Sequence, residues 1–230
     1  MRFVLALLLV PAVLLSRPPA TTAQAPSSRT ATDLAQALQR KYDGIRDFSA
    51  DFIQRYRGGV LRREAVERGT LLVKKPGRMR WDYQAPERKL FVSDGATLYS
   101  YLPEDRQVMV SAVPDDASAS TPALFLAGRG SLTRDFDVSF TEAPSGVAAN
   151  SQALKLVPRT PQADYESLVL SVDPATFALR GLVALDLQGG TSSFTFTNLR
   201  ENIGLADRQF IFEIPRGVEI IRDTTTAPTR

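Results

Sequence analysis

The carboxylates are the clearest candidates for catalysis in this 230-residue chain, because it contains no histidine and no cysteine. That composition excludes histidine-based triads and the usual zinc sites. Three acid pairs lie close together in the sequence: Asp115 with Asp116, Glu64 with Glu67, and Asp135 with Asp137. On a strand, the last pair would share one face, as the paired carboxylates of a glycosidase do. Neighbouring acids on a strand face are more often simply solvated, so the pattern favours a protein without catalysis.

Motifs for nucleotide or metal chemistry are also missing from the sequence. No P-loop is found, and an HExxH motif needs histidine. The segment "GRG" at 128–130 indicates the end of a helix, and "SDG" at 93–95 indicates a turn. We therefore predict that the protein is not an enzyme and that it holds no cofactor and no metal.

The segment "KKPGRMRWDYQAP", residues 74–86, raises a different question. After the Pro-Gly turn, Met79, Trp81 and Tyr83 alternate with charged residues, and alternate side chains on a strand point to opposite faces. One face of this strand is therefore large and apolar, and it carries the only tryptophan of the chain. Such a face covers either an ordinary core or a surface that an apolar ligand visits.

The remaining elements are read from hydrophobic periodicity. Leu34, Leu38 and Tyr42 form one helical stripe, which predicts a helix over about 32–43 with Asp33 as its N-cap and Gly44 at its end. A short apolar helix is expected at about 120–128. Strand-like alternation or hairpin signals predict about ten or eleven short antiparallel strands. The segments with this pattern are "FSADFIQRY", 65–75, "RMRWDY", "KLFVSDG", "TLYSYLP", "RQVMVSAV", "DFDVSF", "ALKLVP", "SLVLSVD", "ALRGLVALD", "TSSFTFTNL" and "QFIFEIP".

So many half-apolar strands need more cover than two helices provide. The sheet can close on itself as a barrel or sandwich with a plain core. Alternatively, it can curl partway and leave a concave apolar trough under the helices, and such interiors suit apolar ligands. Alternation alone favours the plain core over the trough.

The ends of the chain and its charge bound its location and partners. Arg2, an apolar run and small residues up to Ala23 predict a cleaved signal peptide over 1–23 and a single mature domain over 24–230, with a frayed tail from about 223. Formal charge is +3, and loss of two arginines with the signal leaves 26 basic against 25 acidic residues. A nearly neutral protein argues against nucleic-acid binding. Residues 29–89 hold 15 basic and 8 acidic residues. Such a basic half could favour an acidic partner or a membrane surface, but a solvated face is the favoured interpretation.

Five blocks in this order, behind a signal peptide, resemble the LolA family of periplasmic outer-membrane lipoprotein carriers. They are "DFSADFIQR", "GTLLVKKPGRMRWDYQAP", "LFVSDGATLYSYLPEDRQV", "TPALFLAGRGSL" and "FEIPRGVEII". The resemblance implies an incomplete, strongly curved antiparallel β-barrel whose helices form a lid over an apolar cavity. It further implies a monomeric periplasmic chaperone that takes acylated lipoproteins from an inner-membrane ABC transporter. The carrier shields their acyl chains and delivers them to an outer-membrane acceptor.

The resemblance also assigns roles to residues. Many members carry an arginine just before the proline of the second block, and that arginine binds lid backbone when the cavity is empty. Lys75 stands at this position, which makes it a candidate lid latch without the planar fork of arginine. The candidates for lining the acyl-chain cavity are Phe52, Met79, Trp81, Tyr83, Leu98, Tyr101, Leu124 and Phe125.

Other readings stay open beside this one. An outer-membrane LolB-type acceptor normally needs a lipidated cysteine, which this chain lacks, and a sigma-regulator sensor usually needs a second domain. A LolA-like paralogue that carries another lipid or a glycolipid fits the same residues. An envelope enzyme, or a structural protein with a closed core that binds no lipid, are alternatives from other classes.

Overall fold

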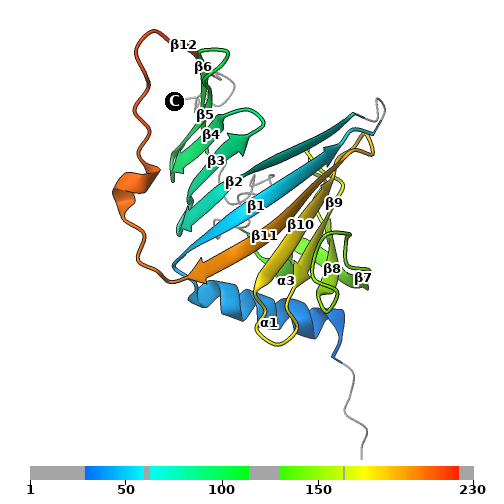
Figure 1. Ribbon diagram of the computed structural model, residues 1–230. Coiled ribbons are helices and arrows are strands. Elements are labelled where there is room, and N and C mark those ends of the chain that lie inside the picture. Colours follow the sequence, from blue (N-terminus) through cyan, green and yellow to red (C-terminus); the bar gives the residue numbers. More distant parts are fainter. Residues whose placement is uncertain (1–28, 60–62, 114–129, 163, 223–230) are drawn as a thin grey trace, which may run out of the picture.

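Twelve strands in one open, strongly curved sheet form the body of the protein in the computed structural model, which describes residues 29–59, 63–113, 130–162 and 164–222 (Figure 1). The strands are β1 (Asp47–Arg57), β2 (Glu64–Lys74), β3 (Arg78–Ala85), β4 (Lys89–Asp94), β5 (Thr97–Leu102), β6 (Gln107–Ala112), β7 (Phe136–Thr141), β8 (Gln152–Pro158), β9 (Ser167–Val172), β10 (Leu179–Leu185), β11 (Thr191–Glu201) and β12 (Glu219–Arg222). Two α-helices, α1 (Ala31–Gly44) and α3 (Leu132–Asp135), and the 3-10 helix η1 (Asp207–Phe210) complete the described elements.

The order of the strands confirms an open curved sheet and rules out a closed one. The sheet runs β12-β6-β5-β4-β3-β2-β1-β11-β10-β9-β8-β7, so β12 and β7 are its two edges. All neighbouring strands are antiparallel except β12 and β6, which are parallel. The incomplete, strongly curved, mainly β architecture expected from the sequence is therefore confirmed, with twelve described strands where about ten or eleven were predicted.

Helix α1 crosses one end of the sheet, beside α3 and β7 (Figure 1). Its N-cap is Thr30 rather than the predicted Asp33. The Thr30 hydroxyl accepts from the Asp33 amide at 3.1 Å, while the Asp33 carboxylate accepts from the Thr30 amide at 2.9 Å. Hydrogen bonds that the Asp33 carboxylate accepts from the Thr30 hydroxyl, at 2.7 Å, and from the Thr30 amide hold the pKa of Asp33 below its usual range. Asp33 thus occupies the third helical position of a capping box, where an acid reaches back to the cap instead of forming it.

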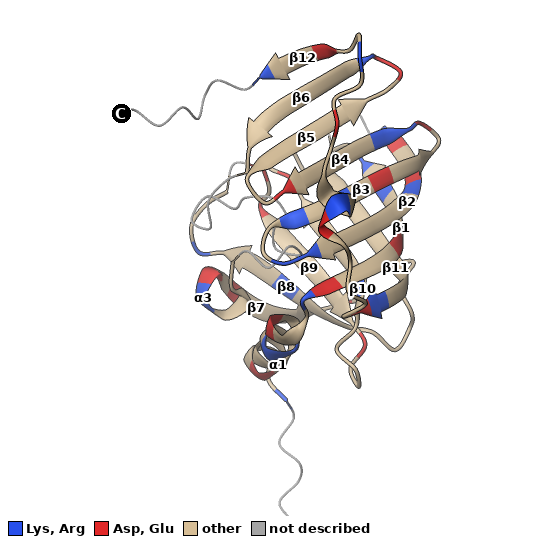
Figure 2. Cartoon of the chain, turned by 90° about the vertical axis from the view of Figure 1, so that its left-hand side faces the viewer, with Lys and Arg blue, Asp and Glu red and all other residues tan. Residues whose placement is uncertain are grey.

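The last segment of the chain is a second departure from the sequence pattern. "QFIFEIP" is predicted as a strand, but it begins in η1 and continues as extended chain outside the sheet. We call residues 203–222 the C-terminal strap, because they run across the outer face of the sheet to reach β6 (Figure 2). Asp207 anchors the strap through ion pairs with Lys74 at 2.5 Å and Arg78 at 3.0 Å.

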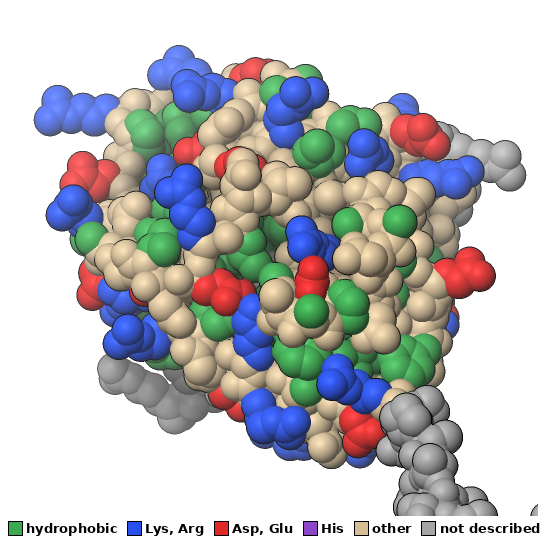
Figure 3. Space-filling view, turned by 60° about the horizontal axis from the view of Figure 1, so that its bottom comes forward, with side chains coloured by type: hydrophobic (Ala, Val, Ile, Leu, Met, Phe, Trp, Pro, Cys, Tyr) green, Lys and Arg blue, Asp and Glu red, His purple; other side chains and the backbone are tan. Residues whose placement is uncertain are grey.

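The sheet separates the apolar residues of the protein into two layers, and the strap belongs to the outer one. The main core lies on the inner, concave face, where Leu34 and Leu38 of α1 pack with the sheet. A smaller group on the outer side comprises Val92 and Val108 of the sheet and Leu205 and Phe210 of the strap, all buried. Seen from the end that carries α1, the surface mixes charged side chains of both signs with hydrophobic ones (Figure 3).

Several sequence predictions lie outside the described residues. They are the signal peptide at 1–23, the helix at 120–128, the acids Asp115 and Asp116, and the tail from 223. Within the described ranges, no helix is long and apolar enough to cross a membrane.

Candidate functional site

The inner face of the sheet carries a continuous group of aromatic rings. Strand register places Phe52 of β1 opposite Phe196 of β11 and opposite Gly69 of β2, and Gly69 lies opposite Tyr83 of β3. A side chain at Gly69 would meet the carbonyl oxygen of Asp82 at 2.0 Å. The missing side chain leaves the rings of Phe52 and Tyr83 free to meet edge to face, with centroids 4.8 Å apart.

We call this group the inner aromatic cluster, and Trp81 lies at its centre. Its members are Phe52, Trp81, Tyr83, Phe91, Phe194 and Phe196. The Trp81 ring is 5.1 Å from Phe52 and 5.2 Å from Phe194 between centroids, both in edge-to-face contact. Tyr83 is 5.6 Å from Phe91, which extends the cluster onto β4. The face that the sequence left open is therefore a connected aromatic wall.

Most of the described cavity candidates lie on this wall. Phe52, Met79, Trp81 and Tyr83 are buried members of the inner core, and Leu98 is partly buried against it. Leu124 and Phe125 lie outside the described residues.

Tyr101 is a correction to the candidate set. It pairs with Leu90, and therefore faces away from Phe91 and Trp81 toward the outer side of the sheet. Its ring lies 5.5 Å from Phe212 of the strap, and it lines a separate outer pocket of about 300 Å³. Tyr101 contributes to holding the strap rather than to the inner wall.

Three rings of the cluster are missing from the candidate set. Phe194 and Phe196 alternate in "TSSFTFTNL", and Phe91 lies in "KLFVSDG". Their alternation is visible in the sequence. Their contact with Trp81 and Tyr83 depends on which strands are neighbours, and the pairing of β1 with β11 joins segments about 140 residues apart.

A polar group bounds the cluster at the end of the strands away from α1. The Tyr83 hydroxyl donates to Gln54 Oε1 at 2.7 Å, and Lys89 Nζ pairs with Glu67 Oε1 at 2.6 Å. We call these four residues the polar rim. The ion pair is half-buried, with 27% of the Lys89 side chain and 15% of the Glu67 side chain exposed. Burial, and then the Glu67 charge, raises the pKa of Tyr83 well above its usual range, so the hydroxyl stays protonated.

Lys75 lies at the opposite end of the inner face, just after β2. Its Nζ donates to the backbone carbonyl oxygen of Tyr42 in the last turn of α1 and stands 5.6 Å from the centre of the Tyr42 ring. A cation is favoured there because the C-terminal end of a helix is partially negative. Burial lowers the pKa of Lys75, and the Asp43 charge partly opposes that shift.

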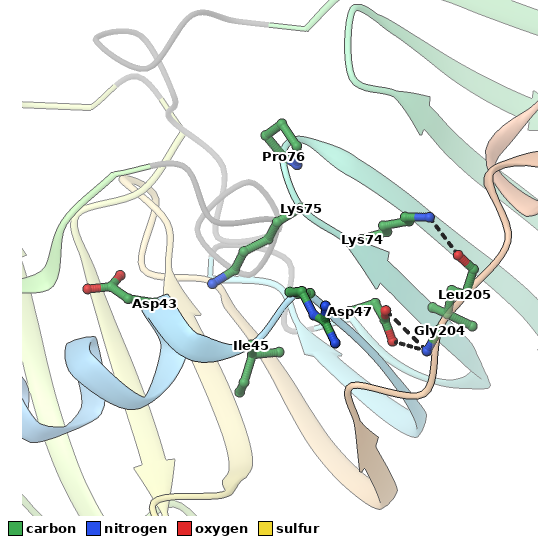
Figure 4. Close-up of a pocket in the computed structure, with 9 residues that line it drawn as sticks. Asp43, Ile45, Asp47, Lys74, Lys75, Pro76, Gly204 and Leu205 are labelled. Atoms are coloured by element: carbon green, nitrogen blue, oxygen red, sulfur yellow. Dashed lines mark hydrogen bonds between the residues drawn. The ribbon is translucent and has the colours of Figure 1, made fainter.

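Lys74 and Lys75 are adjacent in sequence but hold different parts of the molecule (Figure 4). Lys75 reaches α1, whereas Lys74 donates to the Leu205 carbonyl oxygen at 2.7 Å in the strap. Between them lies a pocket of about 620 Å³. It is lined by Asp43, Ile45, Arg46, Asp47, Lys74, Lys75, Pro76, Gly204 and Leu205.

The two acid pairs of the sequence analysis that lie within the described residues do not share a strand face. Asp135 ends α3 and Asp137 lies in β7, so they do not share a strand as the sequence suggested. Hydrogen bonds from Arg134 hold the pKa of Asp135 below its usual range, which is opposite to what a general acid needs. Strand alternation places Glu64 and Glu67 on opposite faces of β2. Among the described residues, no group of three acids could hold a metal ion.

An open curved sheet with an aromatic inner wall and a helix tied across one end defines a class of mainly β proteins, and sequence comparison identifies the family within it. The family described as "Outer membrane lipoprotein carrier protein LolA" matches residues 43–213. The chain therefore belongs to the LolA family.

Named relatives cover nearly the whole chain. An outer-membrane lipoprotein carrier protein of Chromohalobacter salexigens is 31% identical over 89% of this chain and 94% of its own length. That of Cupriavidus taiwanensis is 30% identical over 86% of this chain and 91% of its own. Among solved structures, an uncharacterised conserved protein of Thermus thermophilus shares the fold, with a TM-score of 0.50 and 13% identity over 82% of this chain and 97% of that one.

Proposed function

We propose that this protein is a periplasmic carrier that binds the acyl chains of lipoproteins against its inner aromatic cluster. The names of its relatives support a lipoprotein cargo. The observation that carries the proposal is the inner wall itself, six connected aromatic rings in the same core as a helix that is tied down at one end.

The physical logic concerns the cost of acyl chains in water. Each methylene removed from water contributes roughly 0.8 kcal/mol, so a lipoprotein cannot cross an aqueous compartment unshielded. An apolar wall that is covered when empty avoids exposing a large sticky surface between rounds of transport. Carriage of this kind makes and breaks no covalent bond, so the protein needs no catalytic residue, cofactor or metal.

The proposed cycle begins at an inner-membrane ABC transporter and ends at an outer-membrane acceptor. Export would remove residues 1–23 as a signal peptide, and the mature chain would act as a monomer. Cargo enters when α1 moves from the sheet, and Lys75 is the latch that holds the empty form closed. Release requires reclosure, because a carrier that bound only tightly would never deliver.

The test uses purified mature protein and spheroplasts with a transporter of matched origin. Newly made, outer-membrane-directed lipoproteins should leave the spheroplasts in a soluble one-to-one complex with the carrier. If a folded carrier releases none of them, the lipoprotein proposal fails. Binding of other lipids in the same preparation would then indicate a LolA-like paralogue with different cargo.

A further inference from the structure

The indole nitrogen of Trp81 is a buried donor without a partner among the described residues. Trp81 is only 5% exposed, and its Nε1 makes no hydrogen bond within the described part of the chain. Buried tryptophan N–H groups usually donate to an acceptor, because burying an N–H group without a hydrogen bond costs free energy. An orphaned donor at the centre of the candidate site therefore needs an explanation.

The surroundings of Trp81 offer aromatic rings in place of acceptors. The rings of Phe52, Phe194 and Phe196 lie 5.1, 5.2 and 6.4 Å from its own, between centroids. A ring face compensates an N–H only weakly compared with a carbonyl oxygen. The indole N–H can therefore still donate a hydrogen bond to an acceptor, and the neighbouring phenylalanine rings carry none.

The polar rim supplies a second donor, the ammonium group of Lys89. It carries three N–H groups, of which Glu67 takes one at 2.6 Å, and the Glu87 carboxylate lies 4.0 Å away. The Tyr83 hydroxyl has already donated to Gln54. A ligand that complements this face brings acceptors embedded in an apolar body and needs few acceptors from the protein.

Carbonyl oxygens of ester-linked acyl chains meet that description. A free fatty acid meets it less well, because its carboxylate would approach Lys89 next to the Glu67 charge, which already neutralises the ammonium group. Ether-linked chains have the same apolar body but lack the carbonyl oxygen.

We propose that the inner face recognises the ester carbonyls of its cargo, with Trp81 Nε1 and Lys89 Nζ as the donors. This inference rests on the carrier function proposed above and names the chemical class of ligand at the same site. Acyl chains bound in this way lie along the aromatic wall, with their ester groups between Trp81 and the polar rim.

The single tryptophan makes a direct test available. The purified protein, labelled with ¹⁵N, has one indole N–H resonance. It is titrated with a medium-chain diester of glycerol and, separately, with the dialkyl ether of equal chain length. We expect both to bind, and only the diester to move the indole proton downfield. Saturation with diester without such a shift overturns the inference.

Affinities give an independent second measurement. Displacement of a fluorescent apolar probe yields the ratio of diester to diether affinity, first in the original protein and then in Trp81→Phe, which keeps a ring and removes the donor. We expect this ratio to fall by about tenfold in Trp81→Phe, the size typical of a hydrogen bond to a buried donor. An unchanged ratio overturns the role of Trp81.

Matched charge variants test Lys89. Lys89→Met should lower the diester-to-diether ratio, whereas Arg88→Met, an exposed neighbour, should leave it unchanged. An equal effect of both variants overturns the role of Lys89. If neither lipid binds the original protein, both this inference and the carrier function fail. If both bind with equal affinity and no indole shift, the carrier function survives and the ester inference alone fails.

Discussion

Replacement of Lys75 by leucine is the most direct perturbation of the proposed cycle. Lys75 connects the turn after β2 to the end of α1 through the Tyr42 carbonyl oxygen. Leucine keeps an apolar stem of similar reach to the first carbons of lysine but removes the charge and every donor. The inner wall is untouched, so the variant changes closure without changing the binding surface.

The free energy that Lys75 contributes to the closed form can be worked from its two contacts. A hydrogen bond from a charged group contributes about 1.5–3 kcal/mol. A cation over an aromatic face adds about 0.5–1 kcal/mol at an exposed site. Lys75 is half-buried and its desolvation offsets part of this sum, as its lowered pKa indicates. We take the net effect as about 2 kcal/mol, which changes the ratio of closed to open protein roughly 30-fold.

Closed protein competes with ligand for the inner face, so loss of the latch should strengthen binding by up to that factor. Release should slow correspondingly, because reclosure no longer drives the ligand out. The assay is equilibrium binding of an apolar fluorescent probe, followed by stopped-flow transfer of the probe to acceptor vesicles. Lys75→Arg should behave like the original protein or close more firmly, because arginine offers more donors.

Lys74→Leu is the matched control, since this neighbour holds the strap and not α1. It should reduce stability without changing probe affinity or transfer. The latch assignment is wrong if Lys75→Leu binds and releases the probe like the original protein. It is also wrong if Lys74→Leu reproduces the effect, because the charge rather than the contact would then be responsible.

Three further predictions concern stability. Burial raises the pKa of Tyr165 from about 10 to about 12. Between these pH values the unfolded chain loses the phenol proton and the folded protein keeps it, so the free energy of unfolding should fall as the pH rises. Tyr165→Phe should make this decline smaller, as measured by urea titrations at pH 8 and 11. Gly69→Ala should lower the free energy of unfolding by about 1–3 kcal/mol and lower Tm. The alanine Cβ would lie 2.0 Å from the Asp82 carbonyl oxygen, so the backbone would have to shift. Asp47→Ala should lower the free energy of unfolding by about 1–3 kcal/mol. It should also accelerate amide exchange at 203–204, because the buried Asp47 carboxylate accepts hydrogen bonds from both of these N–H groups. Normal exchange at 203–204 in that variant would contradict the anchoring role.

Local patterns in the sequence predict most of the sheet because burial on one face imposes alternation. The apolar stripe of α1 and the alternation of β3 and β11 lead directly to the observed elements. Assigning faces across strands is harder. Tyr101 and Trp81 are aromatic residues on neighbouring hairpins, which predicts a shared face, yet the two point to opposite sides.

The reason is that β4, β5 and β6 are apolar on both faces. Val92 and Val108 are fully buried on the outer side, where Tyr99 and Tyr101 also lie against Phe212 of the strap. Alternation marks an inner face only where the outer face is polar. The same strap explains the error over "QFIFEIP". Its Phe210 is buried and its Phe212 lies against Tyr99 and Tyr101, while Ile211 between them is exposed, so the segment packs onto the sheet without joining it.

The sequence left open whether Trp81 belongs to a core or to a container, and the contacts show how both descriptions can hold. In the structure its ring packs against Phe52 and Phe194 as any core ring would. About ten methylenes of an acyl chain bring roughly 8 kcal/mol of transfer free energy, well above the latch. The apolar transfer therefore determines that cargo binds, and the smaller contribution of Lys75 determines when the wall is covered again. The unpaired donor at Trp81 Nε1 lowers the stability of the covered form. Less free energy is then needed for cargo to open it.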